Sequence, residues 1–321
     1  MIRTYLIRAA AVAALLMWTL SARSQPPAVM SVTLLGTGSP LPLADRFGPS
    51  TLVEAGADKL LFDCGRGCAI RLFQKGVTLR DVKLFLTHLH SDHTSGIPDV
   101  WLTGWLPILH GNDLASKPLN IAGPEGTKAM MDGLKEAYKG DIAVLAASAY
   151  LGPITANARD ISAGVVYDAG DVKVTAFEVD HGTKIAHTYG YRVDYLGRSV
   201  VISGDTRFDE NVIKYGSGVD VLIHEVAMIK NQALARAPVV RAILAIHTSP
   251  QDAGRVFAAA HPRLAVFTHF TVAGQTGADA PTGDEFVAAA RATYSGPLEA
   301  GEDLMTIRVG ETITVERPRD K

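Results

Sequence analysis

Three histidines and an aspartate crowd into one short segment, T-H-L-H-S-D-H, directly after the apolar run Val82–Leu86 that predicts a β-strand. Alternate residues of an extended segment can point the same way, which lets His88, His90 and Asp92 converge. His93 then turns back beside them. Four nitrogen and oxygen ligands within six residues exceed what one tetrahedral zinc takes once distant ligands join. The spacing therefore favours a pair of metal ions over a polar turn whose histidines are merely hydrogen-bonded.

Further ligand-type residues follow other predicted strands. The runs at 172–179, 199–203 and 264–268 are each followed at once by a polar cluster, and these clusters supply His181, Asp205 and His269. The two oxygens of a carboxylate can each take one cation, so Asp205 could bridge two ions. The pattern predicts a single site built from the ends of several strands.

The order of the predicted elements indicates layered sheets. Early strands are hairpin-like, as at 51–54 and 59–63, whereas later ones alternate with helices expected near 126–138, 250–260 and 283–293. A strand is also expected at 242–246 and a loop at 152–164. This order predicts an α/β fold with two packed sheets and helices outside, forming one domain over residues 29–321.

The first 24 residues have the pattern of an export signal. A basic start is followed by a 12-residue apolar stretch and then by small residues before Gln25. Such a stretch is short for a membrane span, which needs about 20 apolar residues, although an uncleaved anchor is the alternative. We expect cleavage near Ser24 and a periplasmic or secreted protein, with no membrane attachment after cleavage.

The charge and the cysteine content indicate which partners and cross-links to expect. The net charge is −2, and cleavage would make the chain more acidic by removing Arg3, Arg8 and Arg23. No basic footprint for nucleic acid is evident, so we expect no nucleic-acid partner. Two cysteines cannot build a disulfide framework.

These motifs, together with D-H-G, S-G-D-T and T-H-F, resemble the metallo-β-lactamase superfamily over most of the chain. The resemblance implies an αββα sandwich that carries two zinc ions at the sheet edges. It implies one metal on His88, His90 and His181. It places the other on Asp92, His93 and His269, bridged by Asp205, and Asp92 could also accept a proton from the attacking water.

Within the superfamily, G-Y-R, His224-Glu225 and His247-Thr248 resemble the ribonuclease Z-like group. That resemblance implies that His247 acts as a general acid or oxyanion donor and that Glu225 supports it. Two structural readings stand beside it. His247 could belong to a capping segment before the helix at Pro250, and Glu225 could form a buried pair with His224.

The sequence differs from the motifs of the transfer-RNA nucleases in three places. Their loop P-x-K-x-R-N here has Ala44 and Phe47 in place of Lys and Asn, although Arg46 is retained. Their H-S-T element reads H-T-S, and no long Gly/Pro-rich arm is evident between Pro124 and Val172. With the export signal, these differences argue against transfer-RNA processing.

Longer matches resemble the secreted arylsulfatase-like subgroup, among them L-F-D-C-G-R-G and H-S-D-H-T-S-G-I-P-D-V-W-L-T-G-W. The resemblance implies an exported di-zinc hydrolase of a small-molecule sulfate ester, and related enzymes suggest a homodimer. Phosphodiesterase, lactonase and β-lactamase activity on the same site are alternatives. An iron-dependent dioxygenase-type enzyme and a tRNA 3′ endonuclease are remoter ones.

A few residues near the site allow two interpretations. Asp63 could orient a ligand histidine, because ligating imidazoles usually donate their other N–H to a partner. Trp101 and Trp105 could wall an aromatic pocket or belong to the core. Cys64 and Cys68 could form a disulfide in an exported protein or be two small buried residues.

Overall fold

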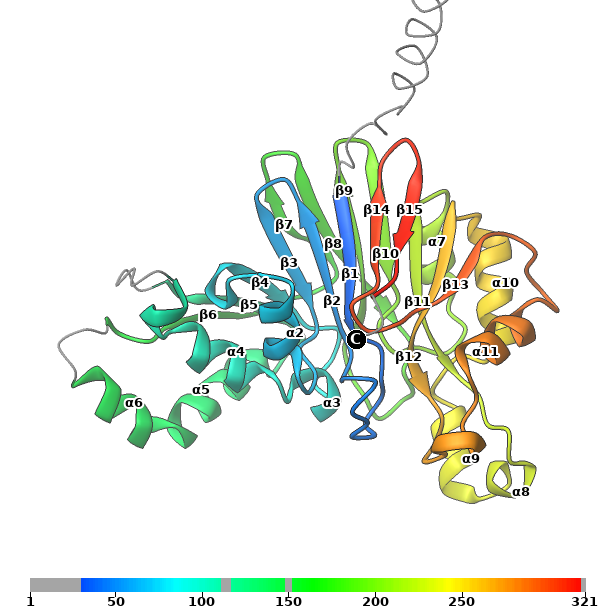
Figure 1. Ribbon diagram of the computed structural model, residues 1–321, viewed down its shortest axis with the longest axis horizontal. Coiled ribbons are helices and arrows are strands. Elements are labelled where there is room, and N and C mark those ends of the chain that lie inside the picture. Colours follow the sequence, from blue (N-terminus) through cyan, green and yellow to red (C-terminus); the bar gives the residue numbers. More distant parts are fainter. Residues whose placement is uncertain (1–29, 111–116, 148–151, 319–321) are drawn as a thin grey trace, which may run out of the picture.

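The computed structural model describes residues 30–110, 117–147 and 152–318 (Figure 1). Two β-sheets face each other and helices cover their outer sides, so the predicted αββα sandwich is confirmed. The export segment predicted at residues 1–24 lies outside the described residues. Among the described helices, none is both long and apolar enough to cross a bilayer.

The first sheet has eight strands in the order β15-β14-β1-β2-β3-β4-β5-β6. Its strands are β1 (Met30–Gly36), β2 (Ser50–Ala55), β3 (Asp58–Phe62), β4 (Val82–Phe85), β5 (Leu119–Gly123), β6 (Ala156–Asp160), β14 (Thr306–Val309) and β15 (Ile313–Glu316). The second sheet has seven strands in the order β13-β12-β11-β10-β9-β8-β7. They are β7 (Gly164–Ala169), β8 (Val172–Val179), β9 (Thr188–Tyr195), β10 (Arg198–Ile202), β11 (Val221–Ala227), β12 (Leu264–Thr271) and β13 (Leu298–Ala300).

Strand direction decides where the polar segments meet. Strands β3 to β6 are parallel to one another, and so are β10 to β13. Strand β8 runs antiparallel to β9, which runs antiparallel to β10, so β8 and β10 end at the same edge. The segments that follow β4, β8 and β10 and the end of β12 therefore gather at one edge of the sandwich.

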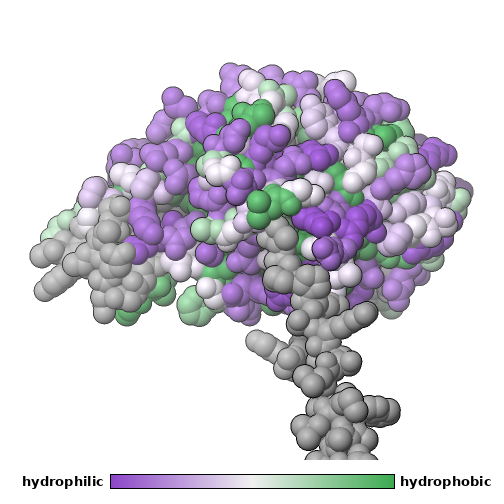
Figure 2. All heavy atoms as spheres, turned by 90° about the horizontal axis from the view of Figure 1, so that it is seen from above, coloured by the Kyte–Doolittle hydropathy of each residue, from purple (hydrophilic) through white to green (hydrophobic). Residues whose placement is uncertain are grey.

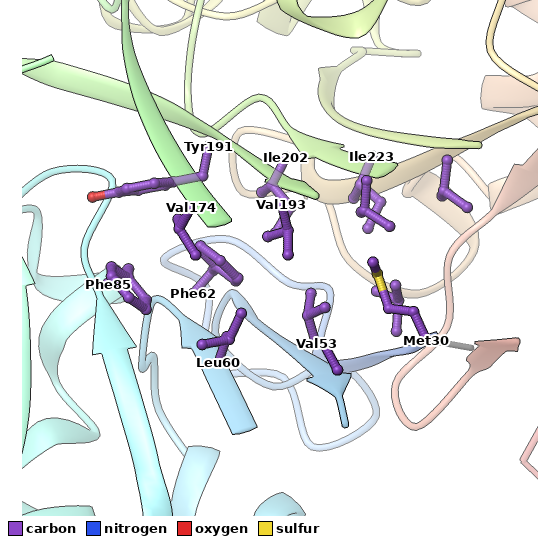
Figure 3. Close-up of a cluster of buried hydrophobic side chains, with 14 of the residues drawn as sticks. Met30, Val53, Leu60, Phe62, Phe85, Val174, Tyr191, Val193, Ile202 and Ile223 are labelled. Atoms are coloured by element: carbon purple, nitrogen blue, oxygen red, sulfur yellow. The ribbon is translucent and has the colours of Figure 1, made fainter. Parts of the chain in front are cut away.

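The core between the sheets consists of apolar side chains that alternate inward along the strands (Figure 3). Phe62 stands at its centre, with its ring centroid 5.4 Å from that of Phe85 and 5.2 Å from that of Tyr191. Burial of this apolar surface holds the two sheets at a fixed separation. The edge that carries the polar segments is thereby positioned rigidly.

Helices pack on both outer faces. On the first sheet these are α2 (Cys68–Gln74), α4 (Ile97–Gly104), α5 (Thr127–Ala137) and α6 (Lys139–Ala146). On the second they are α7 (Glu210–Gly216), α10 (Pro250–Ala260) and α11 (Gly283–Ala290). Three short helices, α3 (Ser91–Thr94), α8 (Gln232–Ala235) and α9 (Pro238–Leu244), lie instead at the edge of the sandwich that carries the polar segments. Figure 2 shows a face that is mostly hydrophilic with scattered apolar residues, as expected for a surface facing water.

Two predicted elements are wrong. The strand expected at 242–246 is instead the end of α9 and the turn after it, because Pro238 at the first helical position starts a helix through this short apolar run. The loop expected at 152–164 contains β6, an edge strand that pairs in parallel with β5. Its mostly exposed side chains lack the apolar alternation that would have revealed it.

Candidate metal centre

The T-H-L-H-S-D-H segment leaves β4 and turns at once into α3. His90 stands at the N-cap of α3 in an extended conformation, and Asp92 and His93 lie within the helix. The turn of the helix brings His93 back toward His88, so that their ring centroids lie 4.2 Å apart. The expected convergence of this segment is therefore present in the fold.

All seven predicted ligands meet at this edge, six of them in two separate triads and the seventh, Asp205, between the triads. His88, His90 and His181 form one triad whose nitrogens all lie within 4.8 Å of one another. Asp92, His93 and His269 form the other within the same limit. Two donor triads side by side are the arrangement that a pair of divalent ions requires.

Asp205 lies between the triads. Its Oδ2 atom is 4.0 Å from His88 Nε2 and 3.7 Å from His181 Nε2. The same atom is 3.4 Å from His93 Nε2 and 3.3 Å from His269 Nε2. A carboxylate in contact with both groups is placed to bridge two cations.

Hydrogen bonds on Nδ1 aim the Nε2 atoms of His88 and His93 at the centre. His93 Nδ1 is 2.8 Å from Asp63 Oδ2. His88 Nδ1 is 3.0 Å from the hydroxyl of Thr87, which itself donates to Asp63. Asp63 also accepts the Thr87 backbone N–H at 2.8 Å, with its own backbone in the left-handed region at φ 58°. The expectation that Asp63 orients a ligand histidine matches this geometry.

The two later histidines are held the same way by residues that sequence reasoning missed. His181 Nδ1 donates to the carbonyl oxygen of Ile246 at 2.8 Å. His269 Nδ1 is 3.2 Å from the hydroxyl of Thr271. The threonine two residues after His269 was a visible signal, whereas a backbone carbonyl leaves none in a sequence.

The donor atoms are chemically suited to a cation. His93 Nε2 and His181 Nε2 are buried with no hydrogen-bond partner, and His88 Nε2 faces His90 Nδ1 at 2.9 Å. Buried nitrogens without partners are costly unless something binds them. The set of imidazole nitrogens and carboxylate oxygens fits a divalent ion such as zinc.

Electrostatics keep most of these donors in the form that binds metal. Burial lowers the pKa of His88, His90 and His181, so their imidazoles are neutral. Burial opposes ionisation of Asp205, but the neighbouring His269 and His93 outweigh it and hold the pKa of Asp205 well below its usual range. Burial also opposes the charged form of His93, but neighbouring carboxylates, chiefly Asp205, outweigh it and raise the pKa of His93 well above its usual value, so a bound metal ion would have to displace that proton.

Beside the triads, His247 is held by Glu225. Glu225 Oε1 lies 3.2 Å from His247 Nδ1 and accepts the backbone N–H of Thr248 at 2.9 Å. Burial alone would lower the pKa of His247, but the Glu225 carboxylate raises it to about 9. His247 is therefore a charged donor at neutral pH. The side chain of His224 does not pair with that carboxylate, because its Nδ1 atom bonds the Glu225 carbonyl instead.

A cavity of about 260 Å³ opens over the triads and His247. Trp101 and Trp105 do not line it, because both pack in the core under α4, with their indole N–H groups donating to Thr155 and Gly152. Cys64 and Cys68 are free and buried, which agrees with the interpretation as two small core residues.

This geometry is matched by known proteins. A family model described as "Beta-lactamase superfamily domain" matches residues 58–270. The chain belongs to the metallo-β-lactamase superfamily. The fold and family imply a binuclear divalent metal site, and the prediction of a metal-dependent hydrolase is confirmed.

Relatives that match most of the chain include proteins named Ribonuclease Z. "Ribonuclease Z" of Mycobacterium avium (strain 104) is 36% identical over 286 residues, covering 88% of this chain and 99% of its own length. "Ribonuclease Z" of Mycolicibacterium gilvum (strain PYR-GCK) is 34% identical over 286 residues, covering 88% and 96%. The structure of human tRNase Z, short form, superposes with a TM-score of 0.63 at 22% identity, covering 87% and 99%. That structure supports the fold.

The prediction of an arylsulfatase-like enzyme with a small-molecule ester as substrate and no nucleic-acid partner is wrong, because these relatives are named for action on RNA. One of the two loop changes that argued against such a role serves packing, because Arg71 stacks on the Phe47 ring at 4.1 Å. The other, Ala44, is exposed, and the retained Arg46 lies 4.2 Å over Phe270. The net charge was also a poor guide to the presence of a nucleic-acid partner, because the summed charge of the chain does not describe the local electric field at a metal site.

Proposed function

We propose that this chain is a ribonuclease Z-type endonuclease that hydrolyses a phosphodiester bond at the 3′ end of transfer-RNA precursors. The observation that carries the proposal is the extent of the likeness to the relatives named Ribonuclease Z, which spans 88% of this chain at 34–36% identity. The site geometry supports it, because two donor triads and a charged histidine face one cavity.

We assign the metals, as zinc, to the residues of the two triads. His88, His90 and His181 would hold one ion, Asp92, His93 and His269 the other, with Asp205 shared between them. When bound, the pair would lower the pKa of a water toward 7 and neutralise charge on the phosphoryl group.

The remaining chemistry falls to the chain's own side chains. Asp92 Oδ2 lies 3.3 Å from His269 Nε2 at the cavity wall, where it can take the proton of the attacking water. As a new P–O bond forms and the old one breaks, the departing ribose oxygen needs a proton. The imidazolium of His247 can give it, and Glu225 keeps that ring charged and oriented.

The test is cleavage of a precursor transfer RNA with a 3′ trailer by purified, zinc-loaded protein. We expect one defined cut near the mature 3′ end and a much slower reaction with His247→Ala. A trailer left intact by protein that still hydrolyses bis(p-nitrophenyl) phosphate would reject the RNA substrate while retaining the phosphodiesterase.

Export remains a separate proposal, based only on residues 1–24. Fractionation of cells that express the full chain tests it. Protein shortened by about 24 residues in the periplasm or medium would support it, and full-length protein in the cytosol would refute it.

A further inference from the structure

The cavity over the metal centre has two unlike walls. One wall carries the predicted ligands His90, Asp92, His181, Asp205 and His269 together with His247. The other wall is mostly apolar and consists of Ser39, Pro40, Leu41, Ile243, Ile246, Thr271, Ala273 and Gly274. The mechanism uses the first wall only, so the second needs its own explanation.

Helix α9 supplies the centre of the apolar wall. Ile243 lies near the C-terminal end of α9, and Ile246 lies just beyond that end, in a turn where its backbone N–H donates to the Ile243 carbonyl at 3.1 Å. Val239, one turn earlier, is 67% exposed. An apolar stripe thus leads from the surface along α9 into the cavity.

This wall is fixed to the metal centre. The carbonyl of Ile246 accepts the Nδ1 hydrogen of His181, and His247 follows directly in the chain. Gly182 permits the approach, because a Cβ there would come within 2.7 Å of the Ile246 side chain. The apolar wall therefore stands at a set distance from the bond to be broken.

The cavity lining indicates the chemistry of its occupant. No Lys or Arg is among the described residues that line it, so it offers no countercharge to a second phosphate. Its volume of about 260 Å³ is below the roughly 300–1,000 Å³ of sites for drug-sized ligands, which leaves room for one planar group. Enzymes and RNA-binding proteins hold unstacked bases between apolar side chains in this way.

We propose that Ile243, Ile246 and Leu41 form a subsite for one unstacked nucleobase next to the scissile phosphate. The proposal rests on the proposed function, because it takes the cleaved bond to join nucleotides. Ile243 is then a specificity-determining residue, since it contacts the base and not the reacting atoms.

The test compares two ligands that share ribose and phosphate and differ only in the base. Dissociation constants of adenosine 5′-phosphate and ribose 5-phosphate are measured by calorimetry on the zinc-loaded protein. Contact with the isoleucine and leucine side chains removes apolar surface of the base from water, so we expect roughly 10-fold tighter binding of the nucleotide, which corresponds to about 1.4 kcal/mol.

Substitutions on α9 locate the preference. Ile243→Asp should bring the ratio of the two dissociation constants close to one, and Ile243→Ala should reduce it part-way. Ala242→Ser is the matched control, because Ala242 is exposed on the same helix and does not line the cavity. Unchanged zinc content and unchanged binding of ribose 5-phosphate show that a variant is folded.

Equal binding of the two ligands by wild type, or a ratio that Ile243→Asp and Ile243→Ala leave unchanged, would overturn the subsite. Failure of the proposed function looks different. Precursor RNA would stay uncleaved while the base preference and its loss in Ile243→Asp remained.

Discussion

The two walls of the cavity differ in how tightly the sequence determines them. The ligand wall is made mostly of buried polar residues, several of them held by a partner outside the wall's donor set, as His181 is by the Ile246 carbonyl. The apolar wall presents partly exposed side chains such as that of Ile243. Chemistry thus depends on fixed donors, whereas substrate choice depends on side chains that can vary without disturbing them. The first wall should tolerate almost no change, and the second should alter selectivity.

The largest effect is expected at Asp205. Asp205→Asn removes the charge that four imidazole Nε2 atoms share within 4.0 Å. An amide oxygen cannot bridge two cations as a carboxylate does, so both ions should be lost and hydrolysis should fall to background. Elemental analysis of the dialysed variant measures this. A variant that keeps two equivalents of zinc would show that Asp205 does not bridge.

His247 comes next. His247→Ala should retain both metals, because the ring belongs to neither ligand triad, and should slow turnover roughly 10²–10⁴-fold through loss of an acid. A substrate with a p-nitrophenol leaving group needs little protonation and should be affected much less than RNA. Equal losses on the two substrates would argue that His247 positions the substrate and does not donate a proton.

A smaller effect on metal binding is expected at Asp63, which contacts a predicted ligand but is not one itself. Asp63→Asn keeps the side-chain shape but removes the charge that accepts from His93 and Thr87. Loss of such a partner typically weakens metal binding about 10–100-fold. A chelator competition measures the zinc dissociation constant. Asp171→Asn, exposed between β7 and β8, is the control and should bind zinc like wild type.

The same contrast explains what could be predicted from the sequence. Ligands such as His181 and Asp205 follow apolar β-runs, and strand ends converge wherever strands share a direction. The sequence therefore shows both the residue type of each ligand and its place at the end of a strand. Ile243 belongs to a short apolar run that fits a strand or a helix equally well, so the sequence predicts a strand where the fold has a helix. The Ile246 carbonyl has no side-chain signature at all. The substrate class was harder to predict, because Phe47, which departs from the nuclease loop pattern, has a packing role under Arg71 that the sequence does not reveal.

The smallest expected effect is a shift of the pH dependence of activity, which tests whether Glu225 sets the pKa of His247. The proton donor His247 is charged below a pKa of about 9 and is lost above it, so activity should decline on the basic side near that pH. Glu225→Gln removes the carboxylate that raises this pKa, which then falls toward the ordinary value of about 6.5. The basic limb should move to lower pH, with zinc content unchanged. A profile that keeps its basic limb in Glu225→Gln would assign that limb to another group, and His247 would then act by its position beside His181 and His269.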